Sequence, residues 1–125
     1  MSKSYDNTIP LFIERRQLQR LIMSIVTDSR QPGEPKDTEG SALFQLYQAF
    51  ATPQETVAFA QAFADGIGWG DAKQQLFEML DRMLSPMRER YEALMADPAG
   101  IEKVLEAGAE KARAVCVPLV KAVRE

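Results

Sequence analysis

Apolar residues recur along this chain at the three- and four-residue spacing of helix faces, and almost nowhere with the alternation of a strand. A first stripe, within about residues 12–28, consists of Leu18, Leu21, Ile22, Ile25 and Val26. Comparable stripes predict helices over about 39–51, 53–64, 71–96 and from 98 onward. We therefore expect an all-α fold, a bundle of about five helices with these stripes packed in its core.

Helix boundaries are marked by prolines, glycines and capping residues. Two prolines and a glycine interrupt residues 29–38, which are therefore predicted to form a loop. Thr52 and Glu55 match a capping box that has proline at the first helical position. Asp71 is expected to cap the fourth helix, and an Asp-Pro pair at 97–98 to start the fifth. A proline at position 86 predicts a kink or a break in the fourth helix.

Single side chains are interpreted first as packing residues. The lone cysteine, Cys116, lies among apolar residues and is predicted to be a buried core thiol. Trp69, next to glycines at a helix start, is predicted to anchor the packing rather than to stack on a base. The stripe of the last helix is predicted to be buried through Ile101, Val104, Leu105, Ala112, Val115 and Leu119. Positions facing water are expected for Arg15, Arg16, Arg20 and the run 88–90.

The amino-acid composition limits which kinds of catalytic and binding site this chain can contain. A chain of 125 residues suits one domain, and it has neither a run of about 18 apolar residues nor a secretory pattern. We therefore expect a cytoplasmic protein without a membrane partner. The absence of histidine and the single cysteine exclude His-dependent catalysis and His- or thiolate-ligated metal sites. The net charge of −3 means that any RNA contact would need a local basic patch.

The first four residues, Met1, Ser2, Lys3 and Ser4, have the composition of a polyphosphate-binding loop. Serine hydroxyls and backbone N–H groups can donate to phosphate oxygens, and a lysine ammonium can neutralise developing charge. Four residues are a weak signal alone, and on this string by itself an ordinary hydrophilic N-terminus is the favoured interpretation.

Ordered motifs behind that string change its interpretation. Met-Ser-Lys-Ser resembles the end of the Lys-Met-Ser-Lys-Ser signature of class I aminoacyl-tRNA synthetases, and the continuation through residue 12 is similar to the tryptophanyl branch. Further segments resemble that branch in the same order: 25–29, 33–37, 40–47, 68–73, 86–91 and 105–112. The chain is thus identified as resembling the C-terminal part of bacterial tryptophanyl-tRNA synthetases over nearly its whole length.

The resemblance implies an organisation and an activity. Residues 1–12 would be a remnant of the signature loop and a linker, and 13–125 the helical domain on the anticodon side. Members of the family join L-tryptophan to tRNA(Trp) through tryptophanyl-adenylate, using ATP with magnesium. Lys3 would contact the ATP phosphates and stabilise the departing pyrophosphate. Ser2 and Ser4 would hold the loop and the phosphates, and Met1 would lie near the adenine.

This sequence departs from the family's pattern in two places, and both limit what we expect of it. The first signature lysine has no counterpart, and without histidine the family's other nucleotide motif cannot be present. We therefore expect a fragment that binds no ATP or magnesium and does not catalyse adenylation alone. In the family, dimer contacts belong largely to the Rossmann-like domain, so the parent is expected to be a homodimer through that domain. This chain alone could be a monomer or could self-associate through apolar surface.

The tRNA contact is expected in the loop after the first helix. Unpaired bases are recognised by hydrogen bonds at their edges and by stacking. Arg30, Lys36 and Asp37 offer such groups on backbone that proline keeps extended. The residues alone favour the alternative, a solvated connector, over a binding site.

Two rival interpretations remain at this stage. The chain could be a stand-alone helical RNA-binding or adaptor protein derived from such a domain, which the coding sequence upstream of Met1 would reveal. It could also belong to the related tyrosyl branch, but Met1 and Ser2 differ from the residues usual in that signature.

Overall fold

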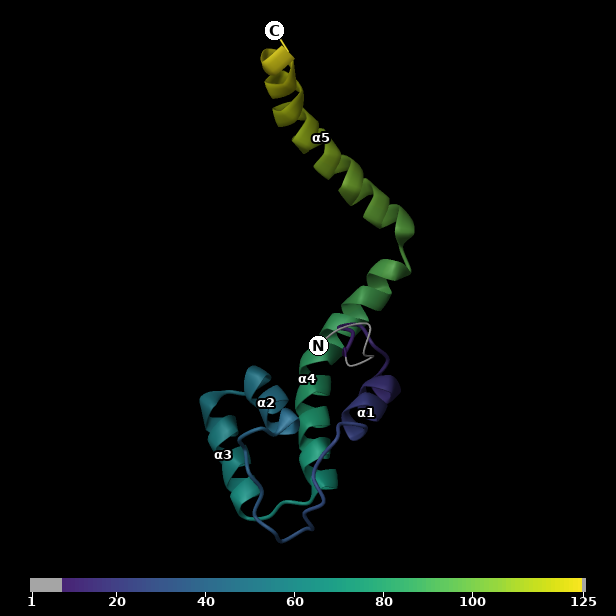
Figure 1. Cartoon of the computed structure of the whole chain (residues 1–125). Coiled ribbons are helices and arrows are strands. Elements are labelled where there is room, and N and C mark those ends of the chain that lie inside the picture. The colour runs from purple at the N-terminus through teal and green to yellow at the C-terminus, as the bar shows by residue number, and fades with distance from the viewer. Residues whose placement is uncertain (1–7, 125) are drawn as a thin grey trace. The chain divides into compact units, whose positions relative to one another are not determined.

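The computed structural model describes residues 8–124, and every regular element within that range is a helix (Figure 1). The helices are α1 (Arg15–Met23), α2 (Ala42–Phe50), α3 (Pro53–Ala64), α4 (Trp69–Met95) and α5 (Pro98–Arg124). The expectation of an all-α fold with five helices is confirmed. The chain forms two compact units, Met1–Arg88 and Glu89–Glu125. Within the described residues, no helix combines the length and apolar character that crossing a bilayer requires.

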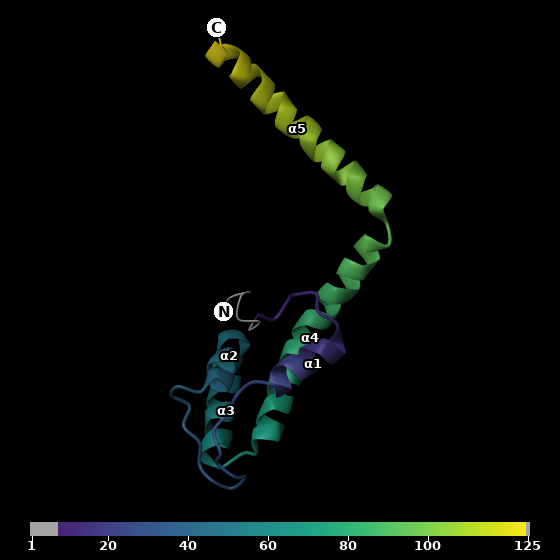
Figure 2. The same cartoon turned by 45° about the vertical axis from the view of Figure 1, so that its right-hand side comes forward.

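The core of the first unit is built from α1, α2, α3 and the first part of α4. Figures 1 and 2 show α2 and α3 side by side. Aromatic rings fill the space beside them: the Phe59 ring stacks on Tyr47 at 3.9 Å between centroids, and Phe63 lies 4.9 Å from Phe59. The largest fully buried side chains are Phe59, Phe63, Phe77, Leu18, Ile22, Leu43 and Leu76.

A capping box starts α3 where the sequence indicated, whereas α2 begins at Ala42, three residues later than expected. The Thr52 hydroxyl accepts the Glu55 backbone N–H at 3.3 Å, and the Glu55 carboxylate accepts the Thr52 N–H at 2.9 Å. This reciprocal pair confirms the predicted capping box. The same hydrogen bonds from Thr52 hold the pKa of Glu55 below its ordinary value, because they favour the ionised form. At the start of α2, Ser41 Oγ accepts the Phe44 N–H at 3.3 Å.

Several helix boundaries differ from the expectation. The first helix covers only Arg15–Met23, so Val26 lies beyond its end and is 89% exposed. The fourth helix begins at Trp69, which puts Asp71 in its first turn rather than at its cap, still near the positive end of the helix. The same helix continues through Pro86 without a break. Hydrophobic spacing predicts which face of a helix is buried better than it predicts where the helix begins and ends.

One arginine of α1 and one of α4 make more hydrogen bonds and ion pairs than side chains on a solvated face would. Arg88 is almost buried: its guanidinium donates to the Ile13 carbonyl at 2.8 Å and to the Asp81 carboxylate at 3.3 Å. The other Asp81 oxygen accepts from Arg15 Nε at 2.8 Å. The expectation of water-facing side chains was therefore wrong for Arg88 and incomplete for Arg15. The Asp81 carboxylate thus ties α1 to α4 through Arg15, and the Arg88 guanidinium ties the segment before α1 to α4.

The second unit contains α5, whose side chains are nowhere buried. The prediction of a buried stripe was wrong here: Val104, Leu105, Val115 and Leu119 are each more than 60% exposed. Cys116 is also exposed, so the prediction of a buried core thiol was wrong. Periodicity shows that a helix has an apolar face but does not show what covers that face.

Candidate nucleic-acid interface

The predicted ATP-contacting residues Met1, Ser2, Lys3 and Ser4 lie outside the described residues 8–124. The other predicted site, the segment between α1 and α2, is described in full. We call residues 24–41 the α1–α2 loop.

Backbone hydrogen bonds join the α1–α2 loop to the turn between α3 and α4. The Gly33 N–H donates to the Gly66 carbonyl at 2.7 Å, and the Lys36 N–H donates to the Phe63 carbonyl at 2.9 Å. Gly66 has φ +83°, a conformation that L side chains rarely adopt. A Cβ atom at Gly66 would lie 2.5 Å from the carbonyl carbon of Gly33. The loop therefore rests on a turn that requires glycine for both its conformation and its close approach.

Lys36 is buried inside this loop, with only 5% of its surface exposed. Its Nζ donates to the carbonyls of Gln31 at 3.1 Å and Glu34 at 3.0 Å, and lies 5.3 Å from the centroid of the Trp69 ring. Two carbonyls and an aromatic face together satisfy an ammonium that is out of water. Lys36 was predicted as an exposed cation, and its ammonium instead holds the loop together from within.

Arg30 holds the outer side of the loop. Its guanidinium donates to the Pro35 carbonyl at 3.1 Å and to the Asp37 carboxylate at 2.6 Å, and it pairs with Asp28 at 3.4 Å. The hydrogen bond to Asp37 raises the pKa of Arg30 above its ordinary value. Asp37 itself is largely exposed, so its remaining acceptor positions face solvent. The structure thus brings Arg30 and Asp37 into direct contact.

Trp69 joins the same cluster from the start of α4. Its indole N–H donates to Asp28 at 3.0 Å, and its ring packs edge-on against Phe63 at 5.6 Å between centroids. The prediction that Trp69 anchors the packing is confirmed by its contact with the core. No local pattern predicts that Trp69 also contacts Asp28 and Lys36, because these residues come from distant segments.

A hollow of about 420 Å³ opens beside this cluster. It is lined by Val26, Thr27, Asp28, Asp37, Glu39, Gly40, Ser41, Ala42 and Trp69. Across the α1–α2 loop, four carboxylates (Asp28, Glu34, Asp37, Glu39) outnumber two cations (Arg30, Lys36), a net charge of −2 (2 − 4). Such a surface repels phosphate but offers acceptors to N–H groups, such as the exocyclic amines of unpaired bases.

The described residues contain no group of three or more His, Cys, Asp or Glu side chains arranged to hold a metal ion. The carboxylates of Asp28, Glu34 and Asp37 are instead engaged with arginine, indole and backbone donors.

Comparison with known proteins assigns this chain to a family. No protein-family model matches it. It is 67% identical to the tryptophan–tRNA ligase of Xanthomonas campestris, covering all of this chain and 29% of that protein. The corresponding ligase of Pseudomonas aeruginosa is 56% identical, with all of this chain and 28% of that protein covered. The chain therefore spans less than a third of the length of these relatives.

Solved structures agree with the sequence relatives. A crystal structure of tryptophanyl-tRNA synthetase from Campylobacter jejuni superposes with a TM-score of 0.91 at 32% identity, covering 98% of this chain and 40% of that one. A second structure of that enzyme, in complex with ADP and tryptophan, gives a TM-score of 0.92 at the same identity. In sequence and in fold, the chain thus belongs to the tryptophan–tRNA ligase family and corresponds to its C-terminal part.

Proposed function

We propose that this chain supplies the tRNA-side helical domain of an enzyme that joins L-tryptophan to tRNA(Trp). The observation that carries the proposal is the similarity of the whole chain to tryptophan–tRNA ligases, at 67% identity in one of them. In this assignment, residues 13–125 form the helical domain and residues 1–12 belong to the signature loop and its linker. The compartment would be the cytoplasm, where tRNA is charged.

The intact enzyme would act in two steps. ATP and tryptophan give tryptophanyl-adenylate and pyrophosphate, and the tryptophanyl group then passes to the 3′ end of the tRNA. Lys3 would stabilise charge on the departing pyrophosphate, and Ser2, Ser4 and Met1 would contact the nucleotide beside it. Magnesium would help to neutralise the negative charge of the ATP phosphates in the first step. The bound ADP and tryptophan of the Campylobacter enzyme support this choice of substrates.

The adenylation chemistry would also need groups outside this chain. A chain without histidine lacks the second nucleotide motif of class I synthetases. The Rossmann-like domain would supply that motif, the tryptophan pocket and the contacts of a homodimer. The 125 residues alone would therefore bind neither ATP nor magnesium in a productive way.

For tRNA, the α1–α2 loop is the part of the chain that we assign to the contact. Asp37 would accept a hydrogen bond from the amino group of an unpaired base, and Arg30 would donate to an acceptor on the same base or its neighbour. Lys36 would act indirectly, because its ammonium is buried and fixes the positions of the other two. The acidic balance of the loop favours contact with base edges over contact with phosphates.

The isolated chain offers a first test. We expect it to bind the anticodon stem-loop of tRNA(Trp) more tightly than a stem-loop of the same length with a different anticodon, measured by fluorescence anisotropy. We also expect no tryptophan-dependent exchange of pyrophosphate into ATP. Equal binding of the two stem-loops would contradict the assignment of the loop. Measurable exchange by the purified chain would contradict the statement that essential groups lie elsewhere in the ligase.

A further inference from the structure

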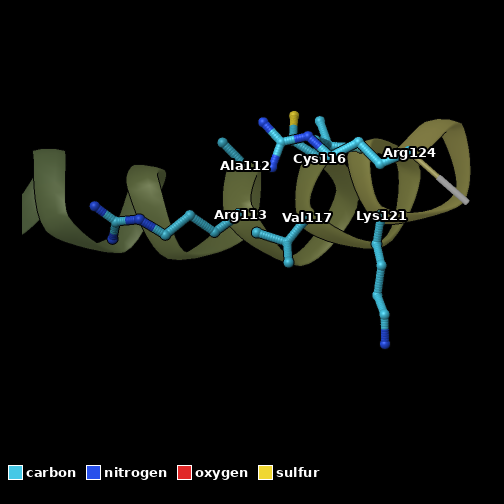
Figure 3. A pocket seen from close by; sticks show the side chains of 7 residues that line it. Ala112, Arg113, Cys116, Val117, Lys121 and Arg124 are labelled. Atoms are coloured by element: carbon cyan, nitrogen blue, oxygen red, sulfur yellow. The ribbon is translucent and has the colours of Figure 1, made fainter.

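Two hollows on the described surface are built in different ways. One, of about 550 Å³, runs along α5, and all its lining residues belong to that helix, between Ala112 and Arg124. Figure 3 shows that their side chains do not point to a common centre, with Lys121 on the side opposite Cys116. The hollow beside the α1–α2 loop instead takes its walls from the loop, the start of α2 and the start of α4. Of the two, only this second hollow has polar groups from several segments around one space.

Asp28 lies where the segments around the second hollow meet. Its Oδ1 accepts the indole N–H of Trp69 at 3.0 Å and the backbone N–H of Arg30 at 3.0 Å. Its Oδ2 lies 3.4 Å from Arg30 Nε. Hydrogen bonds to an ionised carboxylate are stronger than those between neutral groups. One carboxylate thus holds Arg30 by its main chain and its guanidinium, and ties it to the first residue of α4.

Trp69 gives Asp28 a partner whose position is fixed. The indole ring packs edge-on against Phe63, which is fully buried, and the Lys36 ammonium lies 5.3 Å from the centroid of the same ring. The side chain of Arg30, in contrast, is 38% exposed. An exposed arginine ordinarily loses much rotamer freedom when it is held in one geometry, so a single surface ion pair holds it weakly. The link through Asp28 to Trp69 connects Arg30 to the core.

The two aspartates around Arg30 differ in how much of their hydrogen-bonding capacity is free. A carboxylate has about four acceptor positions. Asp28 directs two contacts from Oδ1 and one from Oδ2 to groups of the protein itself. Within residues 8–124, Asp37 accepts from Arg30 at 2.6 Å, and its side chain is 74% exposed. Asp37 is therefore suited to accept from a ligand, and Asp28 is suited to hold Arg30.

From this geometry we propose that Asp28 is a positioning residue for the tRNA contact. It fixes Arg30 to Trp69, and Arg30 in turn fixes the exposed carboxylate of Asp37. A donor and an acceptor recognise a base edge well only when the residues around them hold both in one geometry. The choice between bases thus depends on Asp28, although Asp28 contacts no base. This inference rests on the proposed tRNA contact of the α1–α2 loop and adds the residue that keeps it selective.

Asp28→Asn tests this role with little change to the fold. The oxygen of the amide can still accept from Trp69 and from the Arg30 N–H, but its NH₂ group then faces Arg30 Nε, donor against donor. The 125-residue chain should lose at least about fivefold of its preference for the anticodon stem-loop of tRNA(Trp) over one with another anticodon. Urea denaturation and Trp69 emission should change little. Lost stability with an unchanged preference would show a purely structural role and overturn the proposal.

Glu34→Gln is the matched control, because it removes the same charge from the same loop. The Glu34 carboxylate accepts the Gln31 N–H at 2.6 Å, and an amide oxygen can replace it there. The preference between the stem-loops should keep its parent value. An equal fall for Glu34→Gln and Asp28→Asn would show that the charge of the loop, rather than the position of Arg30, sets the preference, and would overturn the proposal.

Combining Asp28→Asn with Asp37→Asn shows whether Asp28 acts through Asp37. The double variant should bind the tRNA(Trp) stem-loop within about twofold of Asp37→Asn alone, because residues that act as one unit have non-additive effects. Losses that multiply would mean that Asp28 contacts RNA itself, and would overturn the proposal. Equal binding of the two stem-loops by the parent chain would contradict the tRNA contact, and this inference with it. A parent preference that Asp28→Asn retains would contradict only the role of Asp28.

Discussion

Gly66→Ala is expected to lower the free energy of unfolding by about 3 kcal/mol, the largest loss among the glycine variants of this chain. Two costs combine in that number. The residue has φ +83°, where an alanine is strained, and its Cβ would meet backbone atoms of Gly33 at 2.5–2.8 Å. Backbone cannot rotate away as a side chain can. The Gly33 N–H would therefore lose its 2.7 Å hydrogen bond to the Gly66 carbonyl.

Gly40→Ala is the matched control for this variant. Its φ of +75° imposes a similar conformational cost, but no atom lies within 4 Å of the position a Cβ would take. We expect a loss of only about 1 kcal/mol, measured by urea denaturation of both variants and the parent under identical conditions. Equal losses for the two variants would show that the approach of Gly66 to Gly33 contributes nothing to the stability of the loop.

Lys36→Ala is expected to cost about 2 kcal/mol of unfolding free energy, although lysines at a protein surface are usually replaced without loss. Removing the ammonium takes the donor from the Glu34 carbonyl and one of two donors from the Gln31 carbonyl, which still accepts the Glu34 N–H. It also removes the cation beside the Trp69 ring. Because Trp69 is the only tryptophan of the chain, its fluorescence reports directly on this cluster. The emission spectrum of folded Lys36→Ala should therefore differ from that of the parent.

A second substitution separates the charge of Lys36 from its packing. Lys36→Met keeps an unbranched apolar stem and removes the three donors. It should lose nearly as much stability as Lys36→Ala, since the missing hydrogen bonds dominate the cost. In a full-length ligase, Lys36→Ala should also weaken tRNA charging while leaving adenylate formation unchanged. Unaltered stability and unaltered Trp69 emission would contradict the role assigned to the ammonium.

How far the sequence predicts this structure depends on how local each feature is. The capping box at Thr52 and Glu55 is set by residues three apart, and it formed as expected. The helices were predicted because hydrophobic spacing is local as well. Lys36 was placed wrongly because its partners include Trp69 and the carbonyl of Phe63, which only the folded chain brings near. No pattern within residues 29–38 marks that lysine as buried.

Arg88 and Cys116 were misplaced for two opposite reasons. Arg88 stands in a charged run that is typical of a solvated face, yet Asp81 and the Ile13 carbonyl draw it into the fold. Cys116 stands in an apolar stripe that is typical of a core, yet no part of the described chain covers it. In both cases the local pattern was sound. The contact with Ile13, distant in sequence, helped to bury Arg88, and the lack of a covering segment within the described residues left Cys116 exposed.

The most direct test of the assignment compares two reactions of one enzyme. In a full-length ligase whose C-terminal part is this chain, Asp37→Asn keeps an oxygen acceptor for Arg30 but replaces the exposed carboxylate that would accept from a base. The ratio of tRNA charging to tryptophan-dependent pyrophosphate exchange should fall about tenfold, while exchange itself is unchanged. Glu78→Gln, an exposed carboxylate on α4, should leave the ratio at the parent value. An unaltered ratio for Asp37→Asn would contradict the proposal that the α1–α2 loop reads the tRNA.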